Sequence, residues 1–285
     1  MENMRALRAR IKSVESTGKI TKSMKMVASS KLRKTQSAAY NLKVFASRSE
    51  EMLSGLLCAR KLPANPFLIS HGDGGRTVYV LFLGNRGLCG VYNTALLHYM
   101  EYLAEESGDV ASVVVVGRWG HEAVLNSGLS VLRFFEDISD TPSSEEAAAL
   151  TDYLRELYLN QTADKIVLVY QHTKSVLSQS PGCRQLLPVT PLPGAEALSD
   201  YIFEPDASGV LDALVDLYLE NTVYAALLEA KAGEHSARMV AMSSAADNTD
   251  ELISQLNLEL NHARQTAITT EITEISGGAV FGVGH

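Results

Sequence analysis

A glycine-rich stretch contains the first residues whose types and spacing could do chemistry. The sequence GNRGLCGVYN covers residues 84–93, after a strand-like apolar run and before a helix-like run. Such loops can cradle phosphates with backbone N–H groups at a helix N-terminus. The glycines at 84, 87 and 90 do not have the spacing of the dinucleotide fingerprint, and no Gly-Lys-Ser/Thr follows. The pattern favours tight turns over a nucleotide site, and a nucleotide-dependent enzyme remains the alternative.

Cys89, in the same stretch, is the candidate nucleophile. His98 and His121 could serve as its base, but no acid or second motif completes a catalytic arrangement. Cys58, Cys89 and Cys183 are far apart, so their spacing indicates neither a zinc site nor a disulfide framework. We therefore expect no catalytic residue, no cofactor and no metal.

Charge is divided unevenly along the chain. Residues 1–34 hold ten Lys or Arg and two Glu, a net charge of +8, whereas the whole chain has a net charge of −8. A basic arm on an acidic body indicates nucleic acid, acidic lipid or an acidic protein as partner. The first 39 residues contain no aromatic residue, which disfavours a nucleic-acid platform. Nucleic-acid binding therefore stays a minor alternative.

The start of the chain is basic but lacks the apolar stretch of a secretory signal. The sequence contains no run of about 18 apolar residues, the length that a membrane-spanning helix needs. We expect a mature N-terminus and a cytoplasmic protein.

The longest element that must position these residues lies near the C-terminus. Residues 234–276 contain neither Pro nor Gly, and at helical rise they would extend roughly 65 Å. Small or apolar residues recur in steps of three and four, which predicts a coiled-coil seam with His235 and Thr249 as polar intruders. These positions are Leu228, Ala232, Met239, Met242, Ala246, Ile253, Leu256, Leu260, Ala263 and Ala267.

The N-terminal segment predicts a second long helix, because no Pro occurs before Pro63. Its seam begins with Met4, Leu7, Ile11, Val14 and Gly18, and we expect it to resume, shifted by one residue, at Ile20, Met24 and Val27. A helix docked on a domain is the alternative. The matching helix at the other end favours a two-helix coil.

Between the two helices, strand-like and helix-like runs alternate. We predict strands at 78–83, 110–116, 129–135 and 165–171, helices at 93–106, 121–126 and 144–160, and an edge strand at 186–189. Ser143 and Ser144 before Glu145 and Glu146 form a favourable helix start. Continuous apolar strands separated by helices predict an α/β fold with a mainly parallel sheet covered on both faces.

The predicted division is an N-terminal helix at 1–60, an α/β domain at 61–205, and a C-terminal helix and tip at 206–285. Because both inner helix ends join one domain, we expect the helices to run antiparallel. The longer C-terminal helix should overhang its partner by roughly 20 Å. Its apolar tip, ITEISGGAVFGVGH, would need a protein socket.

Three stretches carry a family resemblance: RARIKSVESTGKITKSMKMVASSKLRK, RGLCGVYN and EHSARMVAMSSAADNTDELISQLNLELNHARQTAITTEITEI. They resemble the gamma subunit of the bacterial F-type ATP synthase, its central rotor stalk. The resemblance implies an antiparallel coiled coil with an inserted Rossmann-like domain, and no catalysis of its own. It also implies torque transmission between a proton-driven c-ring and catalytic beta subunits.

The implied partners are the alpha and beta subunits of the catalytic hexamer, the epsilon subunit and the c-ring. The implied location is the cytoplasmic face of the bacterial plasma membrane, as a peripheral protein. By resemblance, the positions that contact the beta subunit are Lys12, Lys19, Lys22, Met24, Lys25, Arg238, Arg264, Gln265, Thr269 and Glu271. Those that contact epsilon and the c-ring are Tyr201, Phe203 and Glu204.

Lys31 and Arg33 extend the basic stripe that the resemblance places opposite acidic beta-subunit loops. A merely solvated face is the alternative for this stripe. The ending GGAVFGVGH departs from the short small-residue tail expected of the family, so the top bearing is predicted to be looser here. The lack of a close cysteine pair argues against the redox-regulated chloroplast type.

Overall fold

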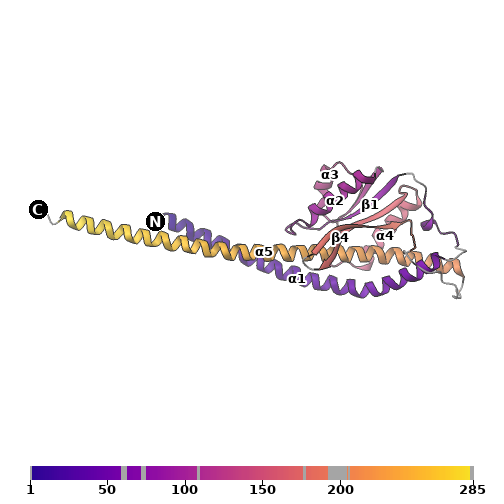
Figure 1. The fold of residues 1–285 in the computed structure, drawn as a ribbon, viewed down its shortest axis with the longest axis horizontal. Coiled ribbons are helices and arrows are strands. Elements are labelled where there is room, and N and C mark those ends of the chain that lie inside the picture. Colours follow the sequence, from indigo (N-terminus) through magenta and orange to yellow (C-terminus); the bar gives the residue numbers. More distant parts are fainter. Residues whose placement is uncertain are drawn as a thin grey trace. The chain divides into compact units, whose positions relative to one another are not determined.

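The computed structural model describes residues 2–58, 63–71, 75–107, 110–175, 178–191, 204 and 206–282. The chain forms two compact units, one of residues 1–27 with 239–285 and the other of residues 28–238. The two long helices, α1 (Glu2–Leu57) and α5 (Ala207–Gly282), contribute to both units (Figure 1). We call residues 1–27 with 239–285 the coil unit, and residues 28–238 the sheet unit.

The sheet unit is built on five strands in the order β3-β2-β1-β4-β5. Strands β1 to β4 pair in parallel, and β5 pairs antiparallel with β4. In chain order the elements of this unit between α1 and α5 are η1 (Pro66–Leu68), β1 (Arg76–Phe82), α2 (Tyr92–Ser107), β2 (Val110–Val116), α3 (Gly120–Asn126), β3 (Ser130–Phe135), α4 (Ser144–Leu159), β4 (Lys165–Ser175) and β5 (Ser178–Leu187).

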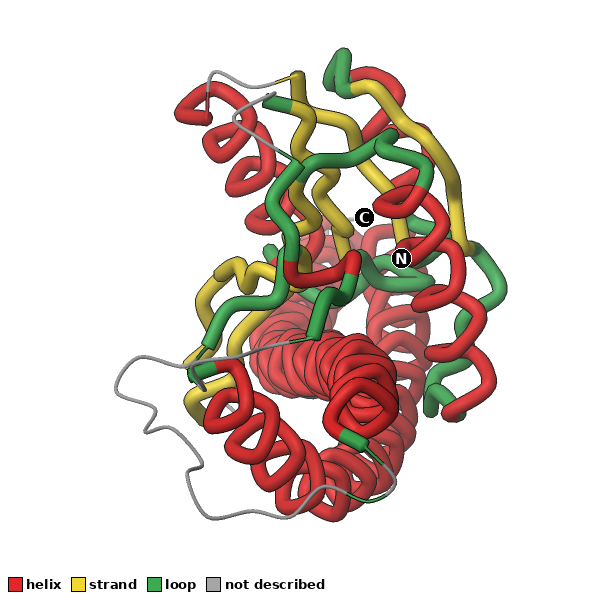
Figure 2. Tube along the Cα trace, turned by 90° about the vertical axis from the view of Figure 1, so that its right-hand side faces the viewer, coloured by secondary structure: helices red, strands yellow, loops and turns green. Residues whose placement is uncertain are grey.

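Side chains alternate between the two faces of the central strands, as a sheet covered on both sides requires. In β1, Val78 and Val80 join a core with α4 and α5, whereas Tyr79 and Leu81 join a second core with α2 and α3. Figure 2 shows the strands with helices to either side. The first part of α5 thus serves as one of the helices that cover the sheet.

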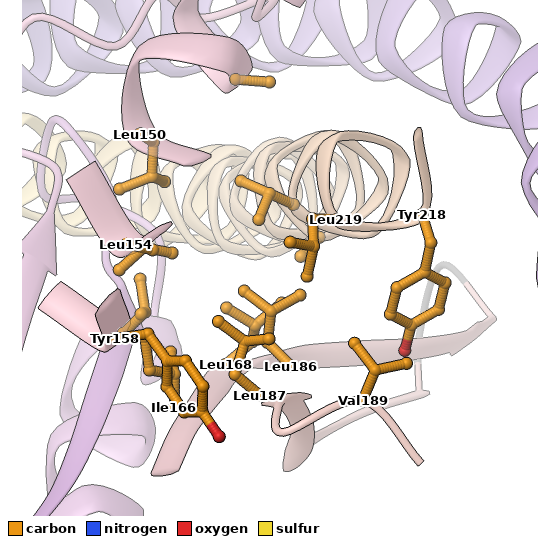
Figure 3. Close-up of a cluster of buried hydrophobic side chains, with 14 of the residues drawn as sticks. Leu150, Leu154, Tyr158, Ile166, Leu168, Leu186, Leu187, Val189, Tyr218 and Leu219 are labelled. Atoms are coloured by element: carbon orange, nitrogen blue, oxygen red, sulfur yellow. The ribbon is translucent and has the colours of Figure 1, made fainter. Parts of the chain in front are cut away.

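Leucines from three elements meet in the core under α5 (Figure 3). Leu154 of α4, Leu168 of β4 and Leu219 of α5 are each at most 1% exposed. Fully burying such a side chain contributes about 1.5–3 kcal/mol. This packing makes the first part of α5 an integral piece of the sheet unit.

The predicted strands and helices are confirmed within a few residues. Ser143 caps α4, with its hydroxyl accepting from the Glu146 backbone N–H while the Glu146 carboxylate accepts from the Ser143 N–H. The predicted extent of the edge strand was wrong, because β5 covers Ser178–Leu187 rather than residues 186–189. The α/β fold class, with two long terminal helices around a mainly parallel sheet, is confirmed.

In the coil unit, α1 and α5 pack antiparallel along a narrow seam. Gly18 lies against Thr249, and Lys25 Nζ donates to Ser243 Oγ over 2.9 Å. Ile11, Met242, Ala246 and Leu256 are buried. Most other described side chains of this unit are at least partly exposed, so the predicted seam of α5 is confirmed for this unit.

The predicted one-residue shift of the α1 seam was wrong. Ile20 and Val27 are both more than half exposed. Thr21 is buried and Met24, the third residue of the shifted set, is partly buried, so the seam passes through these two residues instead. Thr21 satisfies its hydroxyl by donating to the Gly18 carbonyl over 3.0 Å. A threonine can therefore fill a seam position without leaving a polar group unpaired.

Within the coil unit, α5 continues beyond the N-terminal end of α1, as predicted (Figure 1). The described side chains from Arg264 to Thr273 are exposed except for a partly buried Ala267. No helix in the described part of the chain combines the length and the apolar character needed to cross a membrane.

Candidate functional site

The basic residues predicted on α1 lie on the surface of the coil unit. Lys12 and Lys19 are exposed. Lys22 forms an ion pair with Asp250 over 2.8 Å, and both side chains are more than half exposed. An ion pair this exposed is weak in water. The amines of Lys12, Lys19 and Lys22 therefore remain available to an acidic partner.

Met24 is more covered than its apolar neighbours on α1. It is partly buried, whereas Ile20, Met26 and Val27 are exposed. The sequence analysis had put Ile20 and Val27 into the seam, so it missed an apolar outer face on α1. A partly covered methionine beside basic residues can contact a partner with both apolar and charged groups.

The predicted polar residues near the far end of α5 lie on two sides of the helix, with Arg264 and Glu271 on one side and Gln265 and Thr269 on the other. Arg264, Gln265, Thr269 and Glu271 are all exposed. Gln265 and Thr269 are one helical turn apart, and the Thr269 hydroxyl donates to the Gln265 carbonyl over 2.9 Å. The arrangement leaves the Gln265 amide and the Glu271 carboxylate free to face another chain.

Arg238 lies in a quite different environment, within the sheet unit. It is 9% exposed, and its guanidinium donates to the Arg86 carbonyl over 3.0 Å and to the Glu234 carboxylate over 2.7 Å. Lys31, from the basic stripe, is paired with Asp140, whereas Arg33 is exposed. The structure therefore engages both Arg238 and Lys31 in intrachain contacts.

Glu234 is the centre of a buried charge network that sequence reasoning missed. Its carboxylate accepts from Lys231 Nζ over 2.9 Å and from Arg238 over 2.7 Å, and Glu234 is 1% exposed. Burial acts to raise its pKa, but the two cations outweigh burial and hold the pKa below its usual value. Glu234 is thus a carboxylate at neutral pH.

His235, predicted as a polar intruder on the seam, is bonded within the sheet unit instead. Its Nε2 lies 2.9 Å from the Asp140 carbonyl, and its Nδ1 lies 3.5 Å from an Arg238 nitrogen. Only a neutral ring with Nε2 protonated can donate to the carbonyl and accept from Arg238. Burial lowers the pKa of His235, consistent with this neutral form.

The glycine-rich stretch forms a turn packed against α5. A Cβ on Gly84 would lie 3.0 Å from the Glu234 carboxyl carbon, so any larger residue would press against this side chain. Leu88 and Gly90 adopt positive φ angles of 61° and 59°. The turn follows β1, where doubly wound folds usually bind ligands, and here a side chain of α5 lies against it.

Cys89 is unsuited to nucleophilic chemistry in this setting. It is 2% exposed, and burial raises the pKa of its thiol. Its sulfur accepts from Asn93 Nδ2 over 3.3 Å, and the Asn93 Oδ1 accepts from the Gly84 N–H over 2.8 Å. These contacts indicate a role in holding the turn.

Comparisons with known proteins identify the family. A family model described as ATP synthase matches residues 3–280. The chain is 40% identical to the ATP synthase gamma chain of Moorella thermoacetica, over 98% of this chain and 99% of that one. It is 38% identical to that of Halothermothrix orenii, with the same shares covered. The chain belongs to the ATP synthase gamma chain family.

Solved structures agree with the fold of a gamma chain. A chain in the cryo-EM structure of the Euglena gracilis mitochondrial ATP synthase rotor is 19% identical, with a TM-score of 0.66 over 94% of this chain and 99% of that one. A chain in the Tetrahymena thermophila mitochondrial central stalk and c-ring structure is 24% identical, with a TM-score of 0.60 over 79% and 99%. At these identities the likeness supports the fold alone.

The remaining predicted gamma-chain positions are those expected to face epsilon and the c-ring. Tyr201 and Phe203 lie outside the described residues, whereas Glu204 is described and exposed. The predicted contacts of these three residues therefore stay predictions.

Proposed function

We propose that this chain is the central rotor shaft of an F-type ATP synthase. In this role it carries torque between the proton-driven c-ring and the catalytic beta subunits, and couples proton translocation to ATP synthesis or hydrolysis. The alpha and beta subunits surround the coil unit, and epsilon and the c-ring bind near Glu204. The complex works at the cytoplasmic face of the bacterial plasma membrane, to which this chain is peripheral.

The observation that carries the proposal is the construction of the coil unit. Two antiparallel helices share one narrow seam, and the longer helix leaves exposed polar side chains beyond its partner. In such a pair each seam side chain packs between side chains of the other helix. The two helices therefore resist torsion as one unit. Such an element suits the transmission of force better than the enclosure of a substrate.

The coupling mechanism follows from the uneven surface of the coil unit. One side of α1 carries Ile20 and Val27, and its other exposed positions include Lys12 and Lys19. A rotating shaft presents these unlike sides in turn to each catalytic subunit. Because only differential contact can shift a conformational equilibrium, each orientation favours a different state in each subunit.

The chain itself is proposed to be non-catalytic. The turn of residues 84–90 packs against Glu234, whose carboxyl carbon would lie only 3.0 Å from a Cβ on Gly84. The Glu234 side chain thus occupies the space beside the turn where a phosphate would otherwise lie. ATP synthesis and hydrolysis would then take place in the beta subunits, and this chain would set the order in which those subunits act.

The test is to place a positive charge at Met24 in the complete enzyme. We expect Met24→Lys to assemble but to pump fewer protons per ATP hydrolysed, because the added charge disturbs the proposed contact with the beta subunit. Reconstituted vesicles allow ATP hydrolysis and acidification to be recorded on the same preparation.

Met26→Lys is the matched control, since Met26 lies two residues further along α1 and is exposed. We expect its ratio of pumping to hydrolysis to stay near the unmodified value. An unchanged ratio for Met24→Lys in the assembled enzyme would remove Met24 from the coupling contact.

A further inference from the structure

The carboxyl end of β1 is where the sheet unit would be expected to bind a ligand. In doubly wound folds, anionic ligands bind outside the carboxyl ends of parallel strands, beside a glycine-rich turn and a helix N-terminus. Here the turn of residues 84–90 lies between β1 and α2. The group lying against this turn is the Glu234 carboxylate of α5.

We propose that Glu234 is a positioning residue that acts as a built-in anionic ligand and locks α5 to the carboxyl edge of the sheet. Its carboxylate joins Lys231 and Arg238, and Arg238 in turn reaches the Arg86 carbonyl on the turn. The carboxylate thus fixes a guanidinium that bridges α5 to the turn. The significance of this lock for torque rests on the proposed rotor function.

Neighbouring contacts define which part of α5 is locked. Tyr92 Oη donates to the Ala230 carbonyl over 2.9 Å, and Gln179 Nε2 donates to the Gly233 carbonyl over 3.2 Å. His235 reaches the Asp140 carbonyl from the next helical position. Residues 230–238 of α5 are therefore held by the turn after β1, by β5 and by the loop after β3.

The same loop also holds α1. Asp140 pairs with Lys31, and its carbonyl accepts from His235. One short loop thus connects a residue of α1 with a residue of α5 at the edge of the sheet. Glu234 acts next to this junction, so its loss would loosen the helix that carries His235.

The carboxylate matters because it compensates two buried cations at once. Lys231 is 3% exposed and Arg238 is 9% exposed. Removing one member of a buried ion network leaves the remaining charges uncompensated, which is far more disruptive than losing an exposed pair. A neutral residue at 234 should therefore favour local opening of residues 230–238.

Hydrogen exchange of the full chain tests the lock without reference to the rotor. We expect Glu234→Gln, which keeps the shape and removes the charge, to speed exchange of the amides in residues 230–238 by about 100-fold. Asp164→Asn is the matched control, because Asp164 is also buried and paired with Arg76 over 2.7 Å, at the opposite end of β1. It should leave residues 230–238 unchanged.

Chemical rescue distinguishes a missing anion from a misfolded helix. Glu234→Ala removes a group about the size of acetate, so added acetate should restore slow exchange in residues 230–238, whereas chloride at equal ionic strength should not. Rescue by acetate supports the built-in ligand. Exchange at the unmodified rate in Glu234→Gln, or equal rescue by chloride, would overturn it.

The consequence for the complete enzyme is a separate readout. We expect Glu234→Gln to lower proton pumping per ATP hydrolysed under a proton gradient, with Asp164→Asn near the unmodified ratio. Fast exchange with unchanged coupling would overturn the part of the proposal that assigns the lock a role in torque. Failure of the rotor function itself would show instead as a shaft that does not turn while the assembled complex hydrolyses ATP.

Discussion

The two halves of α5 are one continuous helix in two unlike surroundings. Between residues 207 and 238, Leu211, Val215 and Leu219 are fully buried against the sheet unit. Between Met239 and Thr273, the side chains that the structure describes include three buried apolar ones, Met242, Ala246 and Leu256, each on the narrow seam. A helix-forming sequence alone therefore does not decide how firmly a segment is held.

This difference indicates that α5 has a firmly held segment in the sheet unit and a more exposed segment, available to a partner, in the coil unit. The sheet unit covers its stretch of α5 with strands, loops and other helices, whereas the coil unit covers its stretch along one line. Local stability follows buried contact. We therefore expect the coil unit to open more readily alone and to gain most from a surrounding partner.

The largest effect should separate two equally buried leucines. Leu168 and Leu256 are both at most 1% exposed. Leu168→Ala should lower the free energy of unfolding of the sheet unit by about 2–5 kcal/mol, because the packed core cannot collapse around the cavity. Leu256→Ala should affect exchange only in residues 242–260, because two helices can close on each other.

Denaturant unfolding combined with hydrogen exchange by segment measures both leucine variants. If Leu256→Ala destabilised the strands as much as Leu168→Ala does, the two units would not be energetically distinct.

A second effect should show how closely the helices approach in the coil unit. A Cβ on Gly18 would meet Thr249 Oγ1 at 3.0 Å. Gly18→Leu should force the helices apart and destabilise the coil unit by about 1–3 kcal/mol, seen as faster exchange in residues 242–256. Lys19→Leu, at the exposed neighbouring position, is the control, and it should change the exchange of residues 242–256 little. Equal exchange in both variants would contradict close packing at Gly18.

Acid should weaken the sheet unit through His235. Burial lowers its pKa from the ordinary value of 6.5 in the folded chain, so the unfolded chain binds the proton more readily. Stability is therefore fully present above pH 6.5 and falls as the pH drops through 6.5 toward the lowered folded pKa.

His235→Gln should flatten this slope, because glutamine can donate to the Asp140 carbonyl without titrating. Denaturant midpoints measured between about pH 7.5 and 5.5 test it in a window above the acid range of the carboxylates. An identical slope in the variant would show that His235 does not cause the pH dependence of stability.

The smallest effect is expected from the exposed ion pair of the coil unit. The Lys22 and Asp250 side chains are 53% and 56% exposed. Lys22→Ala should therefore cost the isolated chain only about 0.2–1 kcal/mol at low salt, and less at high salt. A salt-independent loss larger than that of Gly18→Leu would mean that the pair is essential to the coil unit.

Much of the fold could be predicted because periodicity records burial. The apolar runs at residues 110–116 and 165–171 fixed β2 and the start of β4, and steps of three and four fixed the seam near Met242 and Leu256. β5 was missed over residues 178–185 because SQSPGCRQ reads as a loop. Backbone pairing with β4, as between Pro181 and Gln171, forms the strand regardless of its composition.

The sites were less predictable because their signals are not periodic. Thr21 was not expected on the seam, since a polar residue there is acceptable only through its bond to the Gly18 carbonyl. Glu234 and Arg238 have the spacing of an ordinary surface pair. Nothing in the sequence indicated that the turn at residues 84–90 would lie over them.

Single-molecule rotation of the assembled catalytic hexamer tests the central claim most directly. Cys183 is exposed and Cys89 is buried, so in a Cys58→Ser variant a thiol-reactive bead label should attach at Cys183. With the hexamer fixed to a surface and ATP supplied, we expect the bead to turn continuously in one direction. A bead that stays in place while the complex hydrolyses ATP would contradict the account.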